Sequence, residues 1–538
     1  MTVTANYVTS SFNSSFPDQD LQTVTAYDAA GDRVNVRDPK SIVTQFQYDL
    51  LDRMTVVTDA LTGTTHYAFS AAGQVITITD ALGHNSTLGY DLLDRQTRQA
   101  DALGHTAVYT YNAAGDRVGL LDANGKVTSY SYDLLGQPTA IDYPAGTSDV
   151  SFTYNGAGER TQMTDGLGTT SWIYDQMGRP ITVTDPFSAA VGYVYDSAGN
   201  RLTLTYPDCR VAHYTYDLAS RLTAVSSLCQ DSATNTYSYD PAGRLITTTL
   251  ANGITTIAGY DGADRLHTLS HSQFGWTIGA YTYTVDASGN RIGAVERLQA
   301  PDALPDTITT TVISYTYDNL YRLTAADYSS GQVFTYTYDA VGNRLADGSP
   351  SGATSYSYDD VNRLTTIDGS ISYTWDDNGN LIDNGQGVTY TYDAANRLIG
   401  VNGTTFTYSY GAPITYTNDI AGGLAQVLVE SSATGGATYL YGVARIAQQI
   451  PASTDYFLDD GLGSVRELAD ASGDVILEKN YEPFGRAPTT YGSGSTPYGF
   501  AGEYQDPTAF YYLRARYYTS RRGRFIEADS WKGRTGQA

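Results

Sequence analysis

Aromatic and small hydroxyl residues alternate in short segments through most of this chain. In the segment that starts at Ser355, serines separate the rings of Tyr356 and Tyr358, and polar turn residues follow. Period-two alternation of this kind predicts a β-strand that carries both rings on one face. The same Tyr-x-Tyr pattern occurs at Tyr109/Tyr111, Tyr130/Tyr132, Tyr193/Tyr195, Tyr214/Tyr216, Tyr237/Tyr239, Tyr315/Tyr317 and Tyr336/Tyr338.

An aromatic residue, usually followed by aspartate, ends each predicted strand at a nearly fixed interval. The first series is Tyr27, Tyr48, Phe69, Tyr90, Tyr111, Tyr132, Tyr154, Tyr174, Tyr195, Tyr216, Tyr239 and Tyr260. The second series is Tyr317, Tyr338, Tyr358, Trp375, Tyr392 and Tyr410. The interval is about 21 residues in the first series and shortens to about 17 residues after Tyr358, and such a period indicates one supersecondary unit stacked many times.

Each repeat is expected to contain two strands and two tight turns. The aspartate after the aromatic residue can accept hydrogen bonds from backbone amides of the turn. Three residues after it stand glycines or asparagines, which tolerate positive φ: Gly31, Gly115, Gly178, Gly199, Gly243, Gly289, Gly342, Asn362 and Asn396. Arg-Leu or Arg-Val often follows and begins the returning strand, as at Arg201-Leu202 and Arg397-Leu398. A second turn, often Asp-x-x-Gly, sends the chain back.

The number of repeats predicts an all-β fold with a curved sheet. About nineteen repeats give about thirty-eight strands, and at about 4.8 Å per strand the ribbon would be about 180 Å long. Open twisted sheets rarely exceed about ten strands without curling. We therefore expect a coiling, spiral or closed antiparallel structure. The shorter period after Tyr358 predicts shorter strands and a narrowing end.

Composition and charge exclude some partners. The chain has 538 residues, 47 of them tyrosine, and a formal net charge of −25. This charge argues against nucleic acid or an anionic membrane as the primary partner. No apolar stretch approaches about 18 residues, so we expect no membrane span. No secretory signal peptide precedes Tyr7, and we expect a fragment, a processed product or a short member of a longer class.

Cys209 and Cys229 are the two cysteines, and their separation in the sequence is close to one repeat. This separation is compatible with positions on neighbouring units. Two free thiols are the expectation, and a disulfide between the units is the alternative.

The pattern changes near residue 411, which divides the chain into a lead-in (1–20), a repeat region (21–410) and a C-terminal region (411–538). The C-terminal region contains the motifs Asp459-Asp460-Gly461-Leu-Gly463-Ser464-Val465-Arg466, Tyr481-Glu482-Pro483-Phe484-Gly485-Arg486, Tyr511-Tyr512-Leu-Arg514-Ala-Arg516-Tyr517-Tyr518 and Gly523-Arg524-Phe525. The repeats resemble the YD repeats of Rhs proteins, and these motifs make the C-terminal region resemble the Rhs-repeat-associated core domain. Related regions occur in bacterial polymorphic toxins, C components of insecticidal toxin complexes, wall-associated proteins and, more distantly, teneurins.

The resemblance implies a hollow shell that encloses an attached effector and is capped by an inward-spiralling core domain. In many members this core domain resembles an aspartic-type autoprotease, and Arg516 and Asp529 match its arginine and aspartate. The family's Asp-Pro-x-Gly reads Asp529-Ser530-Trp531-Lys532-Gly533 here, and a second Asp-Pro-x-x-Leu does not follow before Ala538. Asp506 or Glu527 is the candidate second carboxylate. We expect these groups to hold the plug together rather than to cleave the chain.

No other motif predicts chemistry. The six histidines (His66, His84, His105, His213, His267 and His271) have no metal-ligand or catalytic spacing, so no cofactor or metal is expected. The leading hypothesis is a non-catalytic, secreted or cell-surface shell that encloses an effector or is completed by a partner. One alternative is an extracellular adhesion or filament protein that binds carbohydrate or other chains through exposed strand edges. The other alternative is a residual autoprotease.

Overall fold

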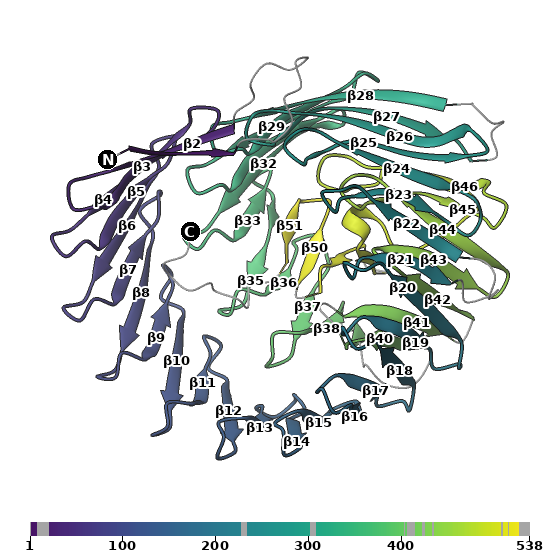
Figure 1. The fold of residues 1–538 in the computed structure, drawn as a ribbon. Helices are drawn as coiled ribbons and strands as arrows, with labels where there is room; N and C mark the ends of the chain where they lie inside the picture. The colour runs from purple at the N-terminus through teal and green to yellow at the C-terminus, as the bar shows by residue number, and fades with distance from the viewer. Residues whose placement is uncertain are drawn as a thin grey trace.

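The structure is a computed structural model that describes residues 2–7, 21–226, 234–301, 308–402, 404–405, 415–421, 425–432, 435–506, 509–514 and 516–526. In these residues the chain is built from β-strands, with one short 3₁₀ helix, η1 (Phe500–Gly502). The strands run around a ring, and the C-terminal strands lie inside it (Figure 1).

The first 34 strands form one antiparallel sheet in which each strand pairs with its neighbours in the sequence. Strands on the first turn of the ring are β1 (Thr2–Tyr7), β2 (Leu21–Tyr27), β3 (Arg33–Arg37), β4 (Val43–Tyr48), β5 (Met54–Thr58), β6 (Thr64–Phe69), β7 (Val75–Thr79), β8 (Asn85–Tyr90), β9 (Gln96–Ala100), β10 (Thr106–Tyr111), β11 (Arg117–Leu121), β12 (Val127–Tyr132), β13 (Pro138–Asp142), β14 (Val150–Tyr154), β15 (Arg160–Asp165), β16 (Gly168–Tyr174), β17 (Pro180–Thr184), β18 (Ala190–Tyr195), β19 (Arg201–Thr205), β20 (Val211–Tyr216), β21 (Leu222–Ser226), β22 (Thr234–Tyr239), β23 (Leu245–Thr249) and β24 (Thr255–Tyr260). The sheet continues through β25 (Leu266–Gln273), β26 (Trp276–Val285), β27 (Arg291–Gln299), β28 (Ile308–Tyr317), β29 (Leu323–Tyr328), β30 (Val333–Tyr338), β31 (Arg344–Ser349), β32 (Gly352–Tyr358), β33 (Leu364–Ile367) and β34 (Ile371–Ser372).

Four smaller sheets follow in the described residues. A pair is formed by β35 (Thr374–Trp375) and β36 (Leu381–Asp383), and a triple by β37 (Tyr390–Tyr392), β38 (Leu398–Val401) and β39 (Thr404–Thr405). The eight-stranded sheet contains β40 (Thr415–Asp419), β41 (Gln426–Ser432), β42 (Gly435–Tyr441), β43 (Arg445–Ile450), β44 (Ser453–Asp459), β45 (Val465–Ala469), β46 (Val475–Asn480) and β47 (Thr489–Gly492). The tail forms β48 (Tyr504–Gln505), β49 (Tyr511–Tyr512), β50 (Tyr517–Thr519) and β51 (Arg524–Phe525).

The hairpin turns confirm the predicted repeat chemistry. In the turn between β28 and β29, Asp318 Oδ1 accepts hydrogen bonds from the backbone amides of Leu320 (2.8 Å) and Arg322 (3.1 Å). The residue three positions after the aspartate has positive φ, and the glycines and asparagines predicted for this position all do, from Gly31 (100°) to Asn396 (59°). The aspartate therefore caps its own turn, as expected.

The turn arginine has a role that the sequence pattern did not reveal, because it connects one repeat to the next. Arg322 Nε donates to Asp318 Oδ2 (2.7 Å), and its Nη1 donates to the carbonyl of Asp339 in the following repeat (2.7 Å). The guanidinium also lies 4.8 Å from the ring centre of Tyr338. The hydroxyl of Tyr338 donates back to the Leu323 carbonyl (2.7 Å). Hydrogen bonds thus connect neighbouring repeats in both directions, from the arginine to the following repeat and from the tyrosine to the preceding one.

Removing one such arginine should measurably loosen the shell. We expect Arg322→Ala to lower the free energy of unfolding by about 1–2 kcal/mol, because a charge-assisted hydrogen bond to the next repeat is lost. Arg322→Lys should lose nearly as much, since an ammonium cannot reproduce the planar fork. Urea unfolding followed by tyrosine fluorescence measures both. The control is Arg98→Ala, because Arg98 is exposed and its Nη2 donates only to the Thr106 hydroxyl among the described residues. An equal loss in this variant would contradict the repeat-to-repeat role.

The ring is a spiral whose second turn lies against the first. Asn378 donates to Asp122, 256 residues away, and the backbone amide of Ala394 donates to Thr147, 247 residues away. Further along, the partners are closer in the sequence: the Tyr193–Asp419 separation is 226 residues and the Tyr328–Tyr481 separation is 153 residues. The spiral turns are thus joined by contacts between residues about 150 to 260 positions apart in the sequence.

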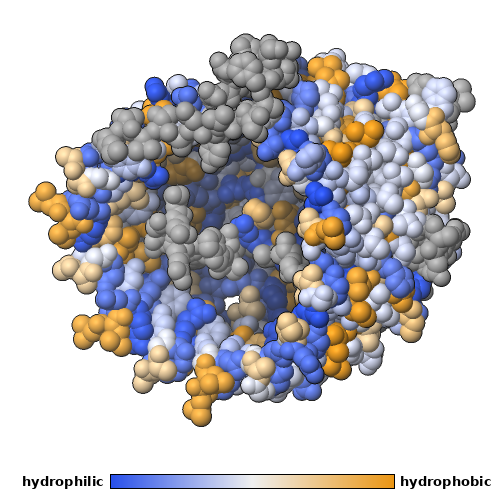
Figure 2. Space-filling model, in the orientation of Figure 1, coloured by the Kyte–Doolittle hydropathy of each residue, from blue (hydrophilic) through white to orange (hydrophobic). Residues whose placement is uncertain are grey.

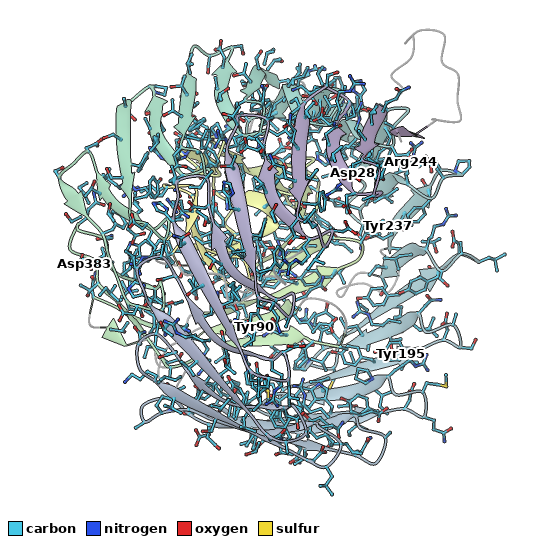
Figure 3. All side chains as sticks on the ribbon, turned by 90° about the vertical axis from the view of Figure 1, so that its left-hand side faces the viewer. Asp28, Tyr90, Tyr195, Tyr237, Arg244 and Asp383 are labelled. Carbon is cyan, nitrogen blue, oxygen red and sulfur yellow. The ribbon has the colours of Figure 1, made fainter. Side chains whose placement is uncertain are left out.

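The largest hydrophobic core lies between two layers. Strands β16–β26 of the large sheet supply Trp172, Val183, Tyr193, Leu204 and Ile278, and the eight-stranded sheet packs against them with residues such as Leu428, Tyr439, Leu458, Leu468 and Leu477. Tyr195 and Tyr237, labelled in Figure 3, lie on β18 and β22 in the part of the wall that this second layer covers. The wall is therefore two layers thick along this arc.

The predicted all-β spiral shell is confirmed, and the strands β33–β39 are two to four residues long, as the shorter period predicts. The predicted boundary at 410/411 falls outside the described residues and stays a prediction. Cys209 is exposed, and Cys229 lies outside the described residues, so the pairing of the two cysteines stays a prediction. No helix in the described part of the chain is both long and apolar enough to cross a membrane.

Candidate functional site

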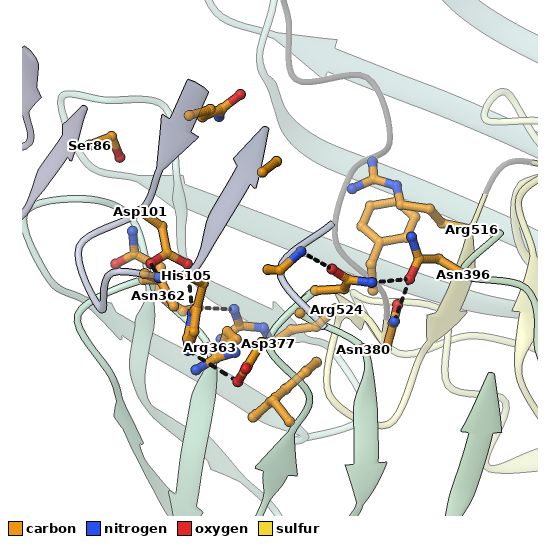
Figure 4. Close-up of a pocket in the computed structure, with 18 of the residues that line it drawn as sticks. Ser86, Asp101, His105, Asn362, Arg363, Asp377, Asn380, Asn396, Arg516 and Arg524 are labelled. Atoms are coloured by element: carbon orange, nitrogen blue, oxygen red, sulfur yellow. Dashed lines mark hydrogen bonds and ion pairs between the residues drawn. The ribbon is translucent and has the colours of Figure 1, made fainter. Parts of the chain in front are cut away.

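The interior of the spiral contains a cavity of about 1600 Å³. Three parts of the chain line it together with Phe484: the inner side of β7–β11, the hairpin turns of the second spiral turn from Tyr338 to Leu398, and the tail from Tyr512 to Phe525. Figure 2 shows the molecule hollowed at its centre, and Figure 4 shows part of the cavity wall. The repeat places each lining residue, because successive strands present the same face to the interior.

Two histidines connect the spiral turns at the cavity wall. His105 Nδ1 lies 2.8 Å from Asp101 Oδ2 in its own turn, and Nε2 lies 3.4 Å from Asp377 Oδ1 in the second turn of the spiral (Figure 4). His84 has the same arrangement one repeat earlier, between Asp80 (3.2 Å) and Asp360 (3.5 Å). Each imidazole thus bridges two carboxylates.

A set of amides continues this seam. Asn378 Nδ2 donates to Asp122 Oδ2 (2.8 Å) and to Asn396 Oδ1 (3.0 Å), and its Oδ1 accepts from the backbone amide of Ala123 (3.1 Å). Asn380 donates to the same Asn396 oxygen (2.8 Å). These bonds connect the two spiral turns along the line where they meet at the cavity wall.

The seam gives a local prediction. In Asn378→Ala the amides of Ala123 and Asn124 lose their acceptor, and four hydrogen bonds disappear in all. We therefore expect the free energy of local opening at this edge to fall by about 1–2 kcal/mol. Hydrogen–deuterium exchange of the peptide that contains Ala123 and Asn124 measures the effect. Asn85→Ala is the control, since Asn85 contacts Thr79 on its own hairpin. Unchanged exchange at Ala123 in Asn378→Ala would contradict the seam.

The cavity wall is rich in arginine although the chain is acidic. Eight arginines and five aspartates line it: Arg117, Arg344, Arg363, Arg397, Arg514, Arg516, Arg522 and Arg524, with Asp80, Asp101, Asp122, Asp360 and Asp377. Several arginines lie over aromatic rings, including Arg524 over Tyr358 (4.6 Å) and Arg344 over Phe484 (5.0 Å). Arg524 also donates to the Asn362 carbonyl (2.8 Å). The tail is therefore attached to the wall by guanidinium contacts.

The predicted autoprotease residues are only partly described. Arg516 lies in the cavity wall, with its guanidinium 3.7 Å from the ring centre of Phe525. Asp506 occupies a turn, where its Oδ1 accepts a hydrogen bond from the Phe510 amide (3.1 Å). Asp529 and Glu527 lie outside the described residues. The catalytic arrangement of Asp529, Arg516 and Asp506 stays a prediction.

A buried ionisable cluster, which the sequence pattern did not single out as chemistry, lies where the eight-stranded sheet meets the first turn. Burial raises the pKa of Asp459 to about 7 and lowers the pKa of His271 to about 4. His271 Nε2 lies 3.0 Å from the Asp459 carbonyl. Gly461 packs so closely on Tyr283 that a Cβ there would lie 2.6 Å from the ring, and its amide donates to the Tyr283 hydroxyl (2.8 Å).

Arg466 is the central cation of this cluster. It is 3% exposed and forms a bidentate pair with Glu296 of β27 at 3.0 and 2.8 Å. Glu467, which follows it, is fully buried, and burial raises its pKa well above the usual range. Among the described residues, no group of three His, Cys, Asp or Glu side chains is arranged to hold a metal ion. The cluster therefore connects the two layers through charge and hydrogen bonds.

Comparisons with known proteins bear on these features. The family model "RHS Repeat" matches residues 27–67, 69–107, 111–148, 154–190, 174–208 and 239–273, and the model "Teneurin YD-shell" matches residues 305–413. The chain is a member of the Rhs/YD-repeat family. The two models follow one another along this YD-repeat chain and include most of its spiral.

Solved structures share the fold of this YD-repeat shell. The crystal structure of TcdB2-TccC3 aligns with a TM-score of 0.72 at 16% identity, over 95% of this chain and 33% of that chain. A Tc holotoxin pore of Photorhabdus luminescens aligns with a TM-score of 0.73 at 15% identity, over 96% and 33%. The YD-repeat chain thus spans about a third of the length of these structures.

Two curated relatives are similar in sequence. The tRNA3(Ser)-specific nuclease WapA of Bacillus spizizenii is 28% identical over 252 aligned residues, covering 41% of this chain and 11% of the relative. The tRNA nuclease WapA of Bacillus subtilis is 27% identical over 252 residues, with the same two shares. The YD-repeat shell spans about a tenth of the length of these relatives.

Proposed function

We propose that this chain is a non-catalytic shell whose interior holds a segment of polypeptide. The observation that carries the proposal is the cavity of about 1600 Å³ between the two spiral turns and the tail. Sites for small molecules are usually about 300–1,000 Å³ and mostly apolar. This one is larger, and arginines and aspartates line it, which suits an extended peptide with polar groups.

The state of the ionisable groups supports a scaffold rather than an enzyme. His84 and His105 are each held between two aspartates, and Arg363 is paired with Asp359 at 2.7 Å. Groups used in this way stabilise the wall. The relatives named as tRNA nucleases and the toxin complexes favour a toxin-associated role, in which any effector activity belongs to a segment other than the described shell. A residual autoprotease that uses Asp529 remains the second candidate, through the resemblance alone.

Compartment and partners follow from the same proposal. We place the shell outside the cell or on its surface, as the Tc toxin resemblance suggests. The chain has a net charge of −25, which disfavours binding of nucleic acid. The arginine excess of the cavity wall favours an acidic peptide as the enclosed segment.

Protease protection tests enclosure. A short acidic peptide is appended after Ala538, and the intact mass of the chain is followed during digestion with proteinase K. The appended peptide is expected to survive while the shell is folded. The control carries the same peptide before Met1. Removal of both peptides at equal rates would contradict enclosure, and tRNA cleavage by the purified chain would contradict the non-catalytic role.

A further inference from the structure

The hairpin tips along one rim of the first spiral turn alternate between large and small residues. This rim carries the turns that follow each Tyr-Asp pair, and every second tip has a large apolar residue: Leu50-Leu51, Leu92-Leu93, Leu134-Leu135, Met177 and Leu218. The tips between them are small: Ala29-Ala30-Gly31, Ala71-Ala72-Gly73, Ala113-Ala114-Gly115, Gly156-Ala157-Gly158, Ser197-Ala198-Gly199 and Pro241-Ala242-Gly243. We call this edge, from Asp28 to Arg244, the leucine rim.

The large tips are exposed to solvent, and the first leucine of four of them is completely exposed. Leu50, Leu92, Leu134 and Leu218 have exposed fractions of 101, 102, 105 and 109%. Separate hydrophobic groups protrude at the left and lower edge of the molecule in Figure 2, where Figure 1 places the hairpins of β4–β13. Leucine at a turn tip has no local function, because the aspartate cap and the positive-φ residue already define the turn.

The other rim of the first turn is covered by this same chain. Its residues Lys40, His84, His105 and Asp122 contact Asp286, Asp360, Asp377 and Asn378, which lie in hairpin turns further along the spiral. Tip-on-tip contact is therefore how this fold joins one turn to the next. The leucine rim is an edge of the same kind that no described part of the chain covers.

We propose that two copies of this chain associate through their leucine rims around a two-fold axis. Neighbouring tips are two strands apart, or about 10 Å. A two-fold axis that passes between a large and a small tip places every large tip of one copy opposite a small tip of the other. Leucines then fill the spaces above the Ala-Ala-Gly turns, and the surface is complementary to itself, as a two-fold interface requires.

The size of the leucine rim fits an interface with a second copy of the chain. It contains eleven hairpin tips, from Asp28 to Arg244, and about two or three residues from each give the 20–30 residues per side of a standard interface. Aspartates stand at the base of the large tips, including Asp52 and Asp94. These charges repel between two copies and also disfavour an anionic lipid surface. The association should therefore tighten as salt is added, because screening weakens the repulsion.

Sedimentation velocity of the full chain over a concentration series tests the proposal. A monomer–dimer equilibrium that shifts toward dimer in high salt is expected. In the triple variant Leu50→Asn, Leu92→Asn and Leu134→Asn, the dissociation constant should rise at least about 100-fold, because several buried leucines are lost from each interface. Phe274→Asn is the control: Phe274 is 86% exposed, lies at a turn away from the leucine rim, and should leave the dimer unchanged.

A second variant separates a shaped interface from general stickiness. Ala71→Leu with Ala113→Leu makes two small tips large, in turns that already accept leucine at the same position in other repeats. The apolar area increases, yet the dimer should weaken because large tips now meet large tips. Tighter association of this variant, or a monomer at all concentrations for the unmodified chain, would overturn the proposal. Circular dichroism and thermal unfolding confirm that each variant is folded.

Discussion

Arg466→Ala is expected to lower the free energy of unfolding by about 3–5 kcal/mol. Arg466 is almost fully buried, and it neutralises Glu296 through two hydrogen bonds of 3.0 and 2.8 Å. Its Nε also donates to the Lys479 carbonyl (2.9 Å). The alanine variant leaves the Glu296 carboxylate uncompensated at the junction between the spiral wall and the eight-stranded sheet. Urea unfolding at neutral pH measures the loss.

Two matched variants show whether the loss comes from the buried charge. Arg53→Ala removes an arginine of the partly exposed turn pair Arg53–Asp49, so it should lose far less, about 1 kcal/mol. The double variant Arg466→Met with Glu296→Leu replaces both charges by apolar groups and should recover much of the stability. If Arg466→Ala were as stable as Arg53→Ala, the pair would not connect the layers in the way described.

Asp459→Asn is expected to stabilise the protein at pH 8 by about 3–4 kcal/mol relative to its effect at pH 4. The Oδ1 atom of Asp459 is buried and has no hydrogen-bond partner among the described residues, and desolvation raises the pKa of this carboxyl from 3.8 to about 7. Between these two pKa values the folded protein keeps a proton that the unfolded chain has released. The contribution of Asp459 to stability therefore falls as pH rises from about 4 to about 7. Asparagine cannot ionise, so the variant escapes this fall.

His271 provides an internal control for the dependence of stability on pH. His271 has a lowered pKa of about 4 in the folded state, so its contribution to stability is complete above its ordinary value of 6.5 and is lost as pH falls through 4. This opposite slope remains in Asp459→Asn. Thermal unfolding at several pH values should show the variant gaining stability with pH where the unmodified chain does not. A constant difference between the two proteins from pH 4 to pH 8 would contradict the buried, protonated state of Asp459.

The strands and hairpin turns of the shell could be predicted from the sequence because residues close together in the chain determine them. The alternation at Tyr356 and Tyr358 predicted the strands, and Asp318 with its turn partners shows the cap that the repeat predicts. Contacts between spiral turns could not be predicted. Asn378 meets Asp122 across 256 residues, and no motif marks either residue as the partner of the other. The two-layer core was hidden for the same reason, since tyrosines are used on both layers.

Fewer residues of the cavity wall could be predicted from the sequence. The resemblance singled out Asp529, Arg516 and Asp506, of which Arg516 lies in the cavity wall. His84 and His105 were set aside because no metal or catalytic spacing connects them. They are one repeat apart in the sequence, and each follows Asp-Ala-Leu-Gly. That coincidence places them on neighbouring hairpins at the same rim, and it is the signal that could have identified a seam residue.

The hydrogen bonds between neighbouring repeats affect how the shell should respond to mechanical force. Strands β2–β15 contact their neighbours and the turn of the spiral beside them, whereas β16–β26 are also clamped by a second layer. A force that pulls on the N-terminus should therefore peel the outer turn one hairpin at a time. Each step would release one repeat, about 70 Å of extended chain, after its arginine and tyrosine ties break. In an optical trap we expect a regular staircase of extensions that stops at a much higher force when the peeling reaches β16.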